Sequence, residues 1–298
     1  MNLLITGAWQ GYEECKEAII KMGHQIHFLQ WEKDDLPLDA AWVEGIIGNG
    51  IFLHHPIEKF VNLRYIQITS AGYDRVPMDY VKEHNITIHN ARGVYSIPMA
   101  EFAMTGVLNL YKQTRFFQKN QENHLFEKNR ILMELSGKNV CIAGCGSVGT
   151  ECAKRFKAFG CQIMGLDLFP REDTWYDKML GMEECDKVLP EADILILTMP
   201  LTKENHHFMN QERLSMMKKG AILVNIARGG IVDTAALITA LENHLGGAVL
   251  DVFEEEPLTA DSPLWDMEHV IVTPHNSFVG EGNRKRLNEV IVGNVLKA

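Results

Sequence analysis

Short apolar runs alternate along the chain with stretches whose apolar residues recur at helical spacing. This alternation is typical of an α/β fold built on parallel sheets. The first hundred residues contain predicted strands at 3–6, 25–29, 45–48, 65–69 and 86–89. Between the first two strands, the pattern predicts a helix from about Tyr12 to Met22, just before Gly23.

A long helical pattern follows, from about Met99 to Gln121. A second series then has predicted strands at 139–143, 162–166, 194–198, 222–226, 248–252 and 270–273. Because no Gly/Ser linker separates the two series, we expect the long helix to connect two domains. A last helix is predicted over about 281–296, and the pattern leaves open which domain it joins.

Composition narrows the class of protein. The net charge is −10, which argues against nucleic-acid binding because phosphate contacts need clustered Lys and Arg. No apolar run reaches the ~18 residues of a membrane span, and the N-terminus is predicted to be a strand rather than a signal peptide. The six Cys form no CxxC pair, which favours buried free thiols over a disulfide or a metal site. We expect a cytoplasmic protein without a metal, membrane or nucleic-acid partner.

The strongest local signal is a Gly-rich turn that follows a predicted strand and begins a predicted helix at about 150–159. In this setting the first Gly permits a tight turn, the second allows the backbone to approach a pyrophosphate, and the third lets helix and strand pack closely. The alternative is a packing turn without a ligand. We expect a dinucleotide to bind here, at Gly144, Gly146, Ser147, Val148 and Gly149.

Asp167 ends the next predicted strand, 23 residues after Gly144. A carboxylate at that place can accept hydrogen bonds from the adenosine ribose hydroxyls and would repel a 2′-phosphate. Its position therefore predicts NAD as the cofactor. In the alternative, Arg171 would accept the 2′-phosphate of NADP.

Three later strands end in polar residues. Arg228 follows the strand at 222–226, Asp251 and Glu254 to Glu256 follow the next strand, and His275 follows the last. Because ligands of open α/β sheets bind beyond the carboxyl ends of the strands, we expect these side chains to converge where a nicotinamide would lie. Each alone would be a surface charge or a turn residue. Together, behind a dinucleotide turn, they favour catalysis.

These residue types suit hydride transfer to a 2-oxo acid. Arg supplies a planar cation with several fixed donors for the substrate carboxylate and carbonyl oxygen. The carbonyl oxygen gains a proton as the hydride arrives, which suits His. A carboxylate beside the His holds its orientation and favours its charged form.

The chain resembles the D-isomer-specific 2-hydroxyacid dehydrogenases over nearly its whole length. The matching motifs are GCGSVG with Asp167, the segment Met199 to Thr202, VNIARGGIVD, LDVFEEEPL and TPH. The resemblance implies Arg228, Glu256 and His275 as the catalytic residues. It adds four cofactor contacts and a substrate loop: Thr198, Pro200, Ala227 and Asp251 for the cofactor, and Ser70, Ala71, Gly72 and Tyr73 for the substrate. It also implies a homodimer built around the long helix.

The chain departs from the family pattern at Tyr73, where a smaller apolar residue is common, at the approach Ser96 to Met99, and after His275. These departures leave the side chain of the 2-oxo acid open. We expect two doubly wound parallel α/β domains with the active site between them: a flavodoxin-like substrate domain (1–97, completed by 278–298) and a Rossmann NAD-binding domain (98–277). The expected function is an NAD-dependent dehydrogenase of a small D-2-hydroxy acid. The alternatives are a non-catalytic NAD(H) sensor or corepressor on the same fold, and an NADP-dependent reductase.

Overall fold

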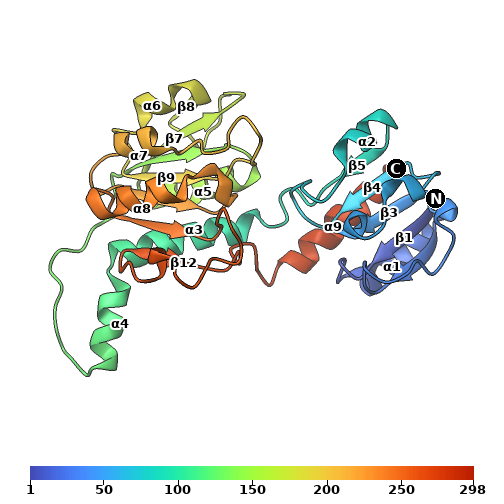
Figure 1. Cartoon of the computed structure of the whole chain (residues 1–298), viewed down its shortest axis with the longest axis horizontal. Helices are drawn as coiled ribbons and strands as arrows, with labels where there is room; N and C mark the ends of the chain where they lie inside the picture. Colours follow the sequence, from blue (N-terminus) through green and yellow to red (C-terminus); the bar gives the residue numbers. More distant parts are fainter. The chain divides into compact units, whose positions relative to one another are not determined.

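Every strand of the protein pairs in parallel with its neighbours, in two separate sheets. The computed structural model describes all residues from Met1 to Ala298. The chain divides into two compact units, each a sheet covered by helices (Figure 1). Unit 1 is Met1–Tyr95 with Gly280–Ala298, and unit 2 is Ser96–Val279. The predicted α/β class with two parallel sheets is confirmed.

Unit 1 has a five-stranded sheet in the order β2-β1-β3-β4-β5, the flavodoxin-like order. Its strands are β1 (Asn2–Thr6), β2 (Gln25–Leu29), β3 (Gly45–Gly48), β4 (Tyr65–Ile68) and β5 (Thr87–His89). Its helices are α1 (Tyr12–Lys21), α2 (Met78–Glu83) and α9 (Asn283–Val295), with short 3₁₀ turns η1 (Ala40–Trp42), η2 (Ile51–Leu53) and η3 (Ile57–Lys59).

The central strands β1, β3 and β4 are buried on both faces, which explains why they are mostly apolar, whereas the edge strands β2 and β5 are partly exposed and carry polar residues. Leu3 and Ile5 of β1 belong to one core cluster, and Leu4 belongs to the cluster on the opposite face. The last helix of the chain completes the first cluster, since Leu287 and Ile291 of α9 pack in it. The open question about the last helix is thereby answered: α9 belongs to unit 1.

Unit 2 has a seven-stranded sheet in the order β12-β11-β10-β9-β6-β7-β8, a doubly wound order that reverses beside β6. Its strands are β6 (Asn139–Ala143), β7 (Gln162–Asp167), β8 (Lys178–Gly181), β9 (Ile194–Leu197), β10 (Ile222–Asn225), β11 (Gly247–Leu250) and β12 (Val270–Val272). Its α-helices are α3 (Ser96–Tyr111), α4 (Thr114–Glu122), α5 (Ser147–Ala158), α6 (Cys185–Val188), α7 (Gln211–Met216) and α8 (Thr234–Asn243). Its 3₁₀ turns are η4 (Met182–Glu184), η5 (Gly229–Ile231) and η6 (Pro263–Trp265).

The single long helix predicted from Met99 to Gln121 is wrong, because the structure has two helices there, α3 and α4. Gln113 adopts a left-handed conformation, φ 52°, that interrupts the helical hydrogen bonding. Its side-chain amide donates to the carbonyl oxygen of Leu110 (3.0 Å), at the end of α3. Polar side chains that bond nearby backbone groups compete with helix continuation, and the apolar pattern does not report this.

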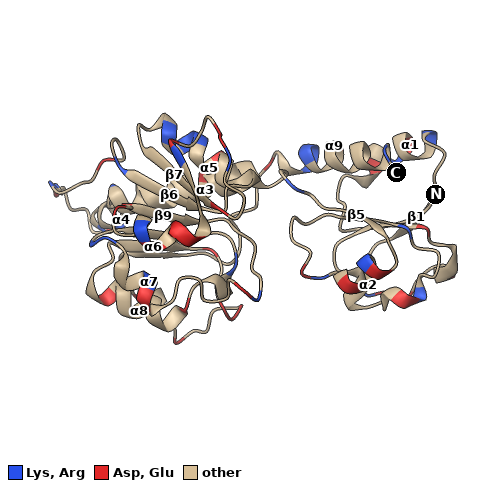
Figure 2. Cartoon of the chain, turned by 90° about the horizontal axis from the view of Figure 1, so that it is seen from above, with Lys and Arg blue, Asp and Glu red and all other residues tan.

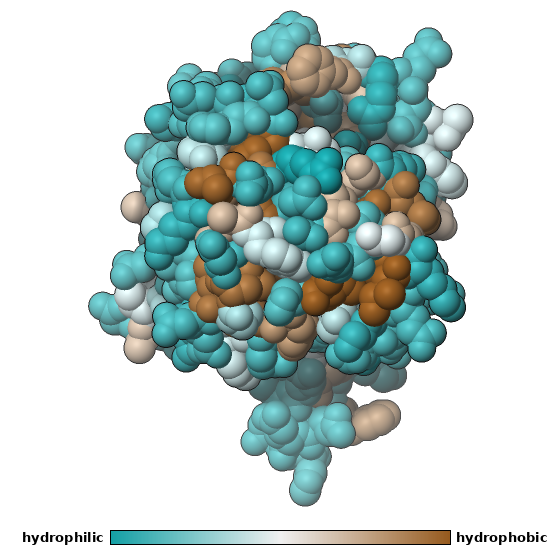
Figure 3. All heavy atoms as spheres, turned by 90° about the vertical axis from the view of Figure 1, so that its right-hand side faces the viewer, coloured by the Kyte–Doolittle hydropathy of each residue, from teal (hydrophilic) through white to brown (hydrophobic).

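In the view of Figure 2, Lys and Arg positions are interspersed with Asp and Glu positions along the ribbon of both units. Figure 3, which views the molecule from the side of unit 1, shows separate apolar patches among polar atoms. No helix has the length and apolar character needed to cross a bilayer. All six cysteines are free thiols and five of them are buried, the partly exposed one being Cys15.

Candidate active site

The Gly-rich turn between β6 and α5 has the backbone that a dinucleotide requires. Gly144 has φ 97°, a left-handed value that favours Gly, and a side chain there would collide with the backbone of Met199. A Cβ on Gly149 would lie 2.2 Å from the carbonyl oxygen of Gly144, so strand and helix approach too closely for any larger residue. Gly146, by contrast, faces open space with no atom within 4 Å. These residues fit a bound pyrophosphate, which needs open backbone at the second Gly and the N-terminus of α5 beside it.

Neighbouring side chains hold this turn in place. Thr198, after β9, donates its hydroxyl to the carbonyl oxygen of Gly144 at 2.5 Å. Asp167, at the end of β7, accepts the backbone N–H of Cys145 at 2.8 Å and that of Phe169 at 3.0 Å. The Asp167 carboxylate is therefore fixed at the tip of its strand, where an adenosine ribose would lie.

Arg171 lies close to the same turn. Its guanidinium donates to the carbonyl oxygen of Cys145 at 2.6 Å. It also lines an open hollow of about 430 Å³, together with Asp173 and Tyr176. The Asp167 carboxylate and the Arg171 guanidinium thus both bond Cys145 of the Gly-rich turn. These two side chains are the candidates that select between NAD and NADP.

Arg228 lies on the turn that follows β10. Asn225, buried at the end of β10, donates to the carbonyl oxygen of Arg228 (3.0 Å) and accepts the N–H of Ala227 (3.1 Å). These two hydrogen bonds of the Asn225 side chain fix the turn, a role that the sequence pattern does not reveal. The guanidinium, partly exposed, donates to the carbonyl oxygen of Ala227 at 2.7 Å.

Gly229 brings the Arg228 turn against the loop after β11. A Cβ on Gly229 would lie 1.8 Å from the backbone carbon of Phe253 and 2.4 Å from the nitrogen of Glu254. Only a residue without a side chain permits this contact. The loop that carries Glu256 and the turn that carries Arg228 are therefore in direct backbone contact.

Glu256 and His275 form a pair. Oε2 of Glu256 lies 2.9 Å from Nδ1 of His275, and Oε1 accepts the backbone N–H of Phe253 at 3.1 Å. The pairing uses Nδ1, and the His275 side chain is 42% exposed, so the other ring nitrogen, Nε2, can be reached from solvent. Phe278 packs against the imidazole, with an interplanar angle of 81°.

Asp251 lies beneath the turn that carries His275. Its side chain is fully buried and accepts three hydrogen bonds, from the Thr273 hydroxyl (2.6 Å) and from the backbone N–H groups of Asn276 (2.7 Å) and Ser277 (2.9 Å). The backbone N–H of His275 donates to the carbonyl oxygen of Asp251 at 2.8 Å. The structure thus shows a use of Asp251 other than the expected cofactor contact: it holds His275 in its left-handed conformation, φ 50°.

The predicted substrate loop is in unit 1, after β4. The carbonyl oxygens of Ser70, Ala71 and Gly72 accept hydrogen bonds from Ala91, Asn90 and the Ser70 hydroxyl. The backbone N–H groups of Ala71, Gly72 and Tyr73 have no hydrogen-bond partner in the structure. Within unit 1, Tyr73 and Asn90 also line a hollow of about 440 Å³. Successive unpaired N–H groups are a common way to hold a carboxylate.

The doubly wound sheet of unit 2, its Gly-rich turn and its Arg, Glu and His side chains define the class of the protein, a dinucleotide-dependent oxidoreductase. The model of the D-isomer specific 2-hydroxyacid dehydrogenase NAD binding domain matches residues 104–277. The chain therefore belongs to the D-isomer specific 2-hydroxyacid dehydrogenase family, and it transfers a hydride between a nicotinamide cofactor and a small hydroxy acid.

Two relatives are similar to most of the chain. (S)-Sulfolactate dehydrogenase of Chromohalobacter salexigens is 34% identical over 245 residues, which is 81% of this chain and 79% of that protein. Glyoxylate reductase of Korarchaeum cryptofilum is 34% identical over 247 residues, which is 80% of this chain and 74% of that protein. The two relatives share a reaction type and differ in the acid that their names give.

Solved structures are similar to the whole chain. A family member from Aeromonas salmonicida has a TM-score of 0.83 at 30% identity and covers 98% of this chain and 93% of its own. D-Lactate dehydrogenase of Aquifex aeolicus, in complex with NAD and lactic acid, has a TM-score of 0.79 at 27% identity, covering 99% and 94%. A family member from Xanthobacter autotrophicus in complex with NADPH and MES has a TM-score of 0.80 at 26% identity, covering 99% and 94%.

Proposed function

We propose that this protein interconverts a small 2-oxo acid and the corresponding D-2-hydroxy acid with NAD(H), through Arg228, Glu256 and His275. The observation that carries the proposal is the Glu256–His275 contact of 2.9 Å on loops that Gly229 and Asp251 hold in place. A paired imidazole with one free nitrogen is the arrangement expected of a proton donor and acceptor. When bound, the nicotinamide supplies or takes up the hydride.

Each protein group has a distinct part in this proposal. Arg228 binds the substrate carboxylate and polarises its carbonyl oxygen with the planar fork of the guanidinium. Nε2 of His275 gives a proton to that oxygen during reduction and takes it back during oxidation, while Glu256 holds Nδ1. The N–H groups of the Ser70 to Tyr73 loop hold the carboxylate, and Tyr73 limits the size of the substituent on the acid.

NAD is the proposed cofactor because the Asp167 carboxylate would face a 2′-phosphate at close range. The remaining cofactor contacts are proposed as the turn Gly144 to Gly149 with Thr198, Pro200 and Ala227. The position of the Arg171 guanidinium beside the Gly-rich turn favours the NADP alternative. The similar family member from Xanthobacter autotrophicus was solved with NADPH, so both cofactors have to be tested.

The protein is also proposed to be a homodimer in the cytoplasm. α4 and the segment after it extend away from the sheet of unit 2 (Figure 1), and they expose apolar side chains, with Phe126 at 101% and Ile131 at 86% of full exposure. A second copy that covers this arm would remove that surface from water. The partners of the enzyme are then a second copy and a small acid.

The experiment is a nicotinamide absorbance assay with a panel of 2-oxo acids, each with NADH and with NADPH. Turnover with NADH that exceeds turnover with NADPH supports the proposal. Turnover with NADPH alone makes Arg171 the determinant. If no acid is turned over although NADH binds, the result favours the alternative of a nucleotide sensor and removes the support for the proposed role of His275.

The dimer has its own test, by light scattering after size-exclusion chromatography. The double variant Phe126→Asp/Ile131→Asp places two negative charges on the exposed segment after α4 and should be a monomer of 33.7 kDa. Wild type should have twice that mass. A wild type that elutes as a monomer would exclude the homodimer.

A further inference from the structure

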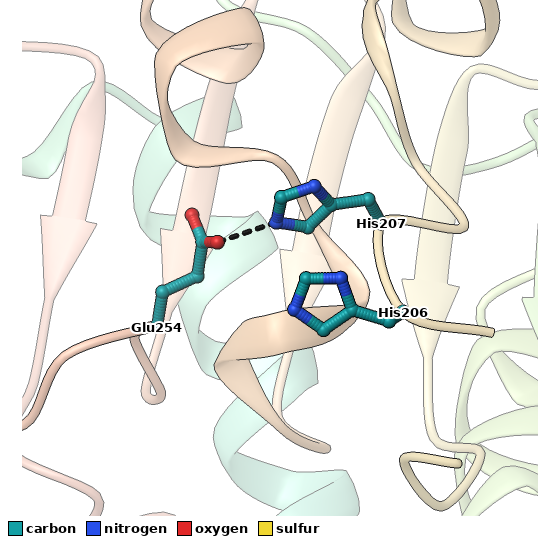
Figure 4. A group of neighbouring side chains, drawn as sticks. All are labelled: His206, His207 and Glu254. Atoms are coloured by element: carbon teal, nitrogen blue, oxygen red, sulfur yellow. Dashed lines mark hydrogen bonds and ion pairs between the residues drawn. The ribbon is translucent and has the colours of Figure 1, made fainter. Parts of the chain in front are cut away.

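Three side chains with metal-ligating atoms meet on unit 2, apart from the His275–Glu256 pair. His206 and His207 lie in the segment between β9 and α7, and Glu254 lies in the loop after β11. One ligand atom of each lies within 4.8 Å of the other two. Figure 4 shows both imidazoles and the carboxylate converging from these two segments. The proposed hydride transfer uses none of the three.

The backbone on both sides of this cluster is fixed by contacts that do not involve the three side chains. The N–H of His207 donates to the carbonyl oxygen of Gly230 at 2.8 Å, and the N–H of Met209 donates to that of Ile231 at 2.9 Å. On the other side, the close approach of Gly229 fixes the backbone at Glu254. The ligand atoms are therefore held near one another by the fold itself, which lowers the entropy cost of binding an ion.

The Glu254 carboxylate is also oriented. Its Oε2 atom accepts the backbone N–H of Thr234, at the start of α8, at 2.8 Å. Its Oε1 atom faces Nε2 of His207 at 2.5 Å. Protein metal sites commonly have such a carboxylate, in which one oxygen is held by a backbone donor and the other binds the ion.

The donor set selects the kind of ion. Two imidazoles and one carboxylate are ligands of Zn²⁺ and related transition metals, whereas Ca²⁺ and Mg²⁺ prefer oxygen ligands throughout. Bonds of about 2.0–2.2 Å place tetrahedral ligand atoms about 3.4 Å apart. The His207 and Glu254 side chains are closer than this, so they must separate by about 1 Å to admit an ion, a change within reach of side-chain rotation at two partly exposed groups.

We propose that His206, His207 and Glu254 form a binding site for one divalent transition-metal ion of the Zn²⁺ kind on unit 2. Water completes the fourth position, because the site is open to solvent on the side of His206. The ion takes the place of the proton that His207 and Glu254 now share, and that proton moves to Nδ1 of His207 or leaves to solvent. Zn²⁺ then links the segment of the two His residues to the loop that also carries Glu256.

This site differs from the sequence-based expectation of a protein without a metal. Two adjacent His residues with a Glu far along the chain do not form a recognisable spacing. The fold brings them together because the segments after β9 and β11 both contact the turn at 229–231.

The test is a titration of the intact, tag-free protein, stripped of metal, with Zn²⁺ alone in competition with a chromophoric chelator. We expect one equivalent of Zn²⁺ per chain. His206→Gln, His207→Gln and Glu254→Gln should each weaken the affinity at least tenfold. His206→Gln is the decisive variant, because it removes one proposed ligand, whose ring packs against His207, and leaves the His207–Glu254 contact in place. Co²⁺ in place of Zn²⁺ should yield a visible absorption band that the same variants lose.

Two controls separate this site from other imidazoles. His124→Gln removes an exposed His elsewhere on unit 2, and His275→Gln removes the proposed proton donor. Both should bind Zn²⁺ as wild type does. The proposal is overturned if wild type binds no Zn²⁺, if the three site variants bind as tightly as wild type, or if only His275→Gln loses the ion. In those cases the His207–Glu254 contact serves only to fasten two loops.

Discussion

Nδ1 of His275 lies 2.9 Å from Oε2 of Glu256, although the two residues are 19 positions apart in the sequence. In the proposed mechanism this contact sets which ring nitrogen would meet the substrate, because Nδ1 is already bonded to the carboxylate. It also gives the proposed mechanism its most direct test, since the two partners can be changed separately.

For His275, the Gln variant should lower turnover by about 10²–10⁴, the usual contribution of a positioned acid or base. The loss should appear in both directions of the reaction, because the same ring nitrogen gives the proton in reduction and takes it back in oxidation, and steady-state kinetics in each direction measures it. A variant that keeps most of its turnover would assign the proton transfer to another group.

Glu256 has a matched control in its neighbour Glu255, which is exposed and makes no hydrogen bond with His275. Glu256→Gln removes the charge beside the imidazole and should lower turnover by about tenfold or more. Glu255→Gln should behave as wild type. Equal activity of the two variants would show that the carboxylate is not coupled to His275.

Arg228→Lys should fail to restore function. An ammonium group cannot contact carbonyl and carboxylate together as the planar guanidinium does. We expect a lower kcat and a higher KM for the 2-oxo acid, with the dissociation constant of NADH near the wild-type value. Steady-state kinetics and NADH fluorescence titration measure these quantities. A Lys variant with most of its activity would make Arg228 a structural residue.

Asp251→Asn tests whether Asp251 positions His275. The Asn side chain cannot accept hydrogen bonds on both of its terminal atoms, so one of the N–H groups of Asn276 and Ser277 loses its partner. This should cost about 1–3 kcal/mol of stability and loosen the turn. Amide hydrogen exchange at Asn276 and Ser277 should accelerate and kcat should fall. If instead only NADH affinity falls, Asp251 acts through the cofactor, as the family resemblance implies.

The Asp193 carboxylate, just before β9, makes contacts in unit 2 that we expect to be sensitive to acid. Burial raises the pKa of this carboxyl, but the Lys218 ammonium at 2.7 Å and the N–H of Asn139 at 3.0 Å outweigh burial and lower it. Because the folded state then has the lower pKa, the stabilisation is present above the ordinary Asp value of about 3.9 and is lost as pH falls through the lowered pKa.

Asp193→Asn should therefore cost about 1–3 kcal/mol at pH 7, measured by urea unfolding. The difference from wild type should shrink below about pH 4. The exposed Glu184–Lys187 pair is the control, since Glu184→Gln should change stability by less than about 1 kcal/mol. A difference that stays constant down to pH 3 would show that the charge of Asp193 is not what stabilises unit 2.

Much of the fold could be predicted because the central strands of both sheets are buried on two sides. Such strands are largely apolar, and β3 and β6 begin and end at the predicted residues. The edge strand β2, although largely exposed, also begins and ends as predicted. β8 was missed because it lies at the edge of its sheet, where Lys178 and its neighbours are not fully buried. The break at Gln113 was missed because a single left-handed residue does not disturb the apolar pattern.

In the site, Arg228, Glu256 and His275 stand out because each follows a strand. The supporting roles of Asn225 and Asp251 could not be predicted in this way, although Asp251 also follows a strand. Asn225 and Asp251 act through hydrogen bonds to backbone groups, and nothing in their own spacing reveals those partners. The close contact at Gly229 was also hidden, because a Gly beside a catalytic residue is a turn signal with or without a neighbour pressed against it.

The place of α9 has a consequence for how the protein is made. Trp9 and Tyr12, near the N-terminus, share a core cluster with Leu287 and Ile291 of α9, and Trp9 donates a hydrogen bond to Asn288. Because synthesis runs from the N-terminus, all of unit 2 (Ser96–Val279) is added to the chain before α9 can complete the core of unit 1. Until then the apolar side chains of unit 1 that α9 covers stay exposed to solvent, where chaperones can bind them. A chain cut just before α9 would keep all of unit 2 and lose part of the core of unit 1, and we expect cellular proteases to degrade it through that exposed surface.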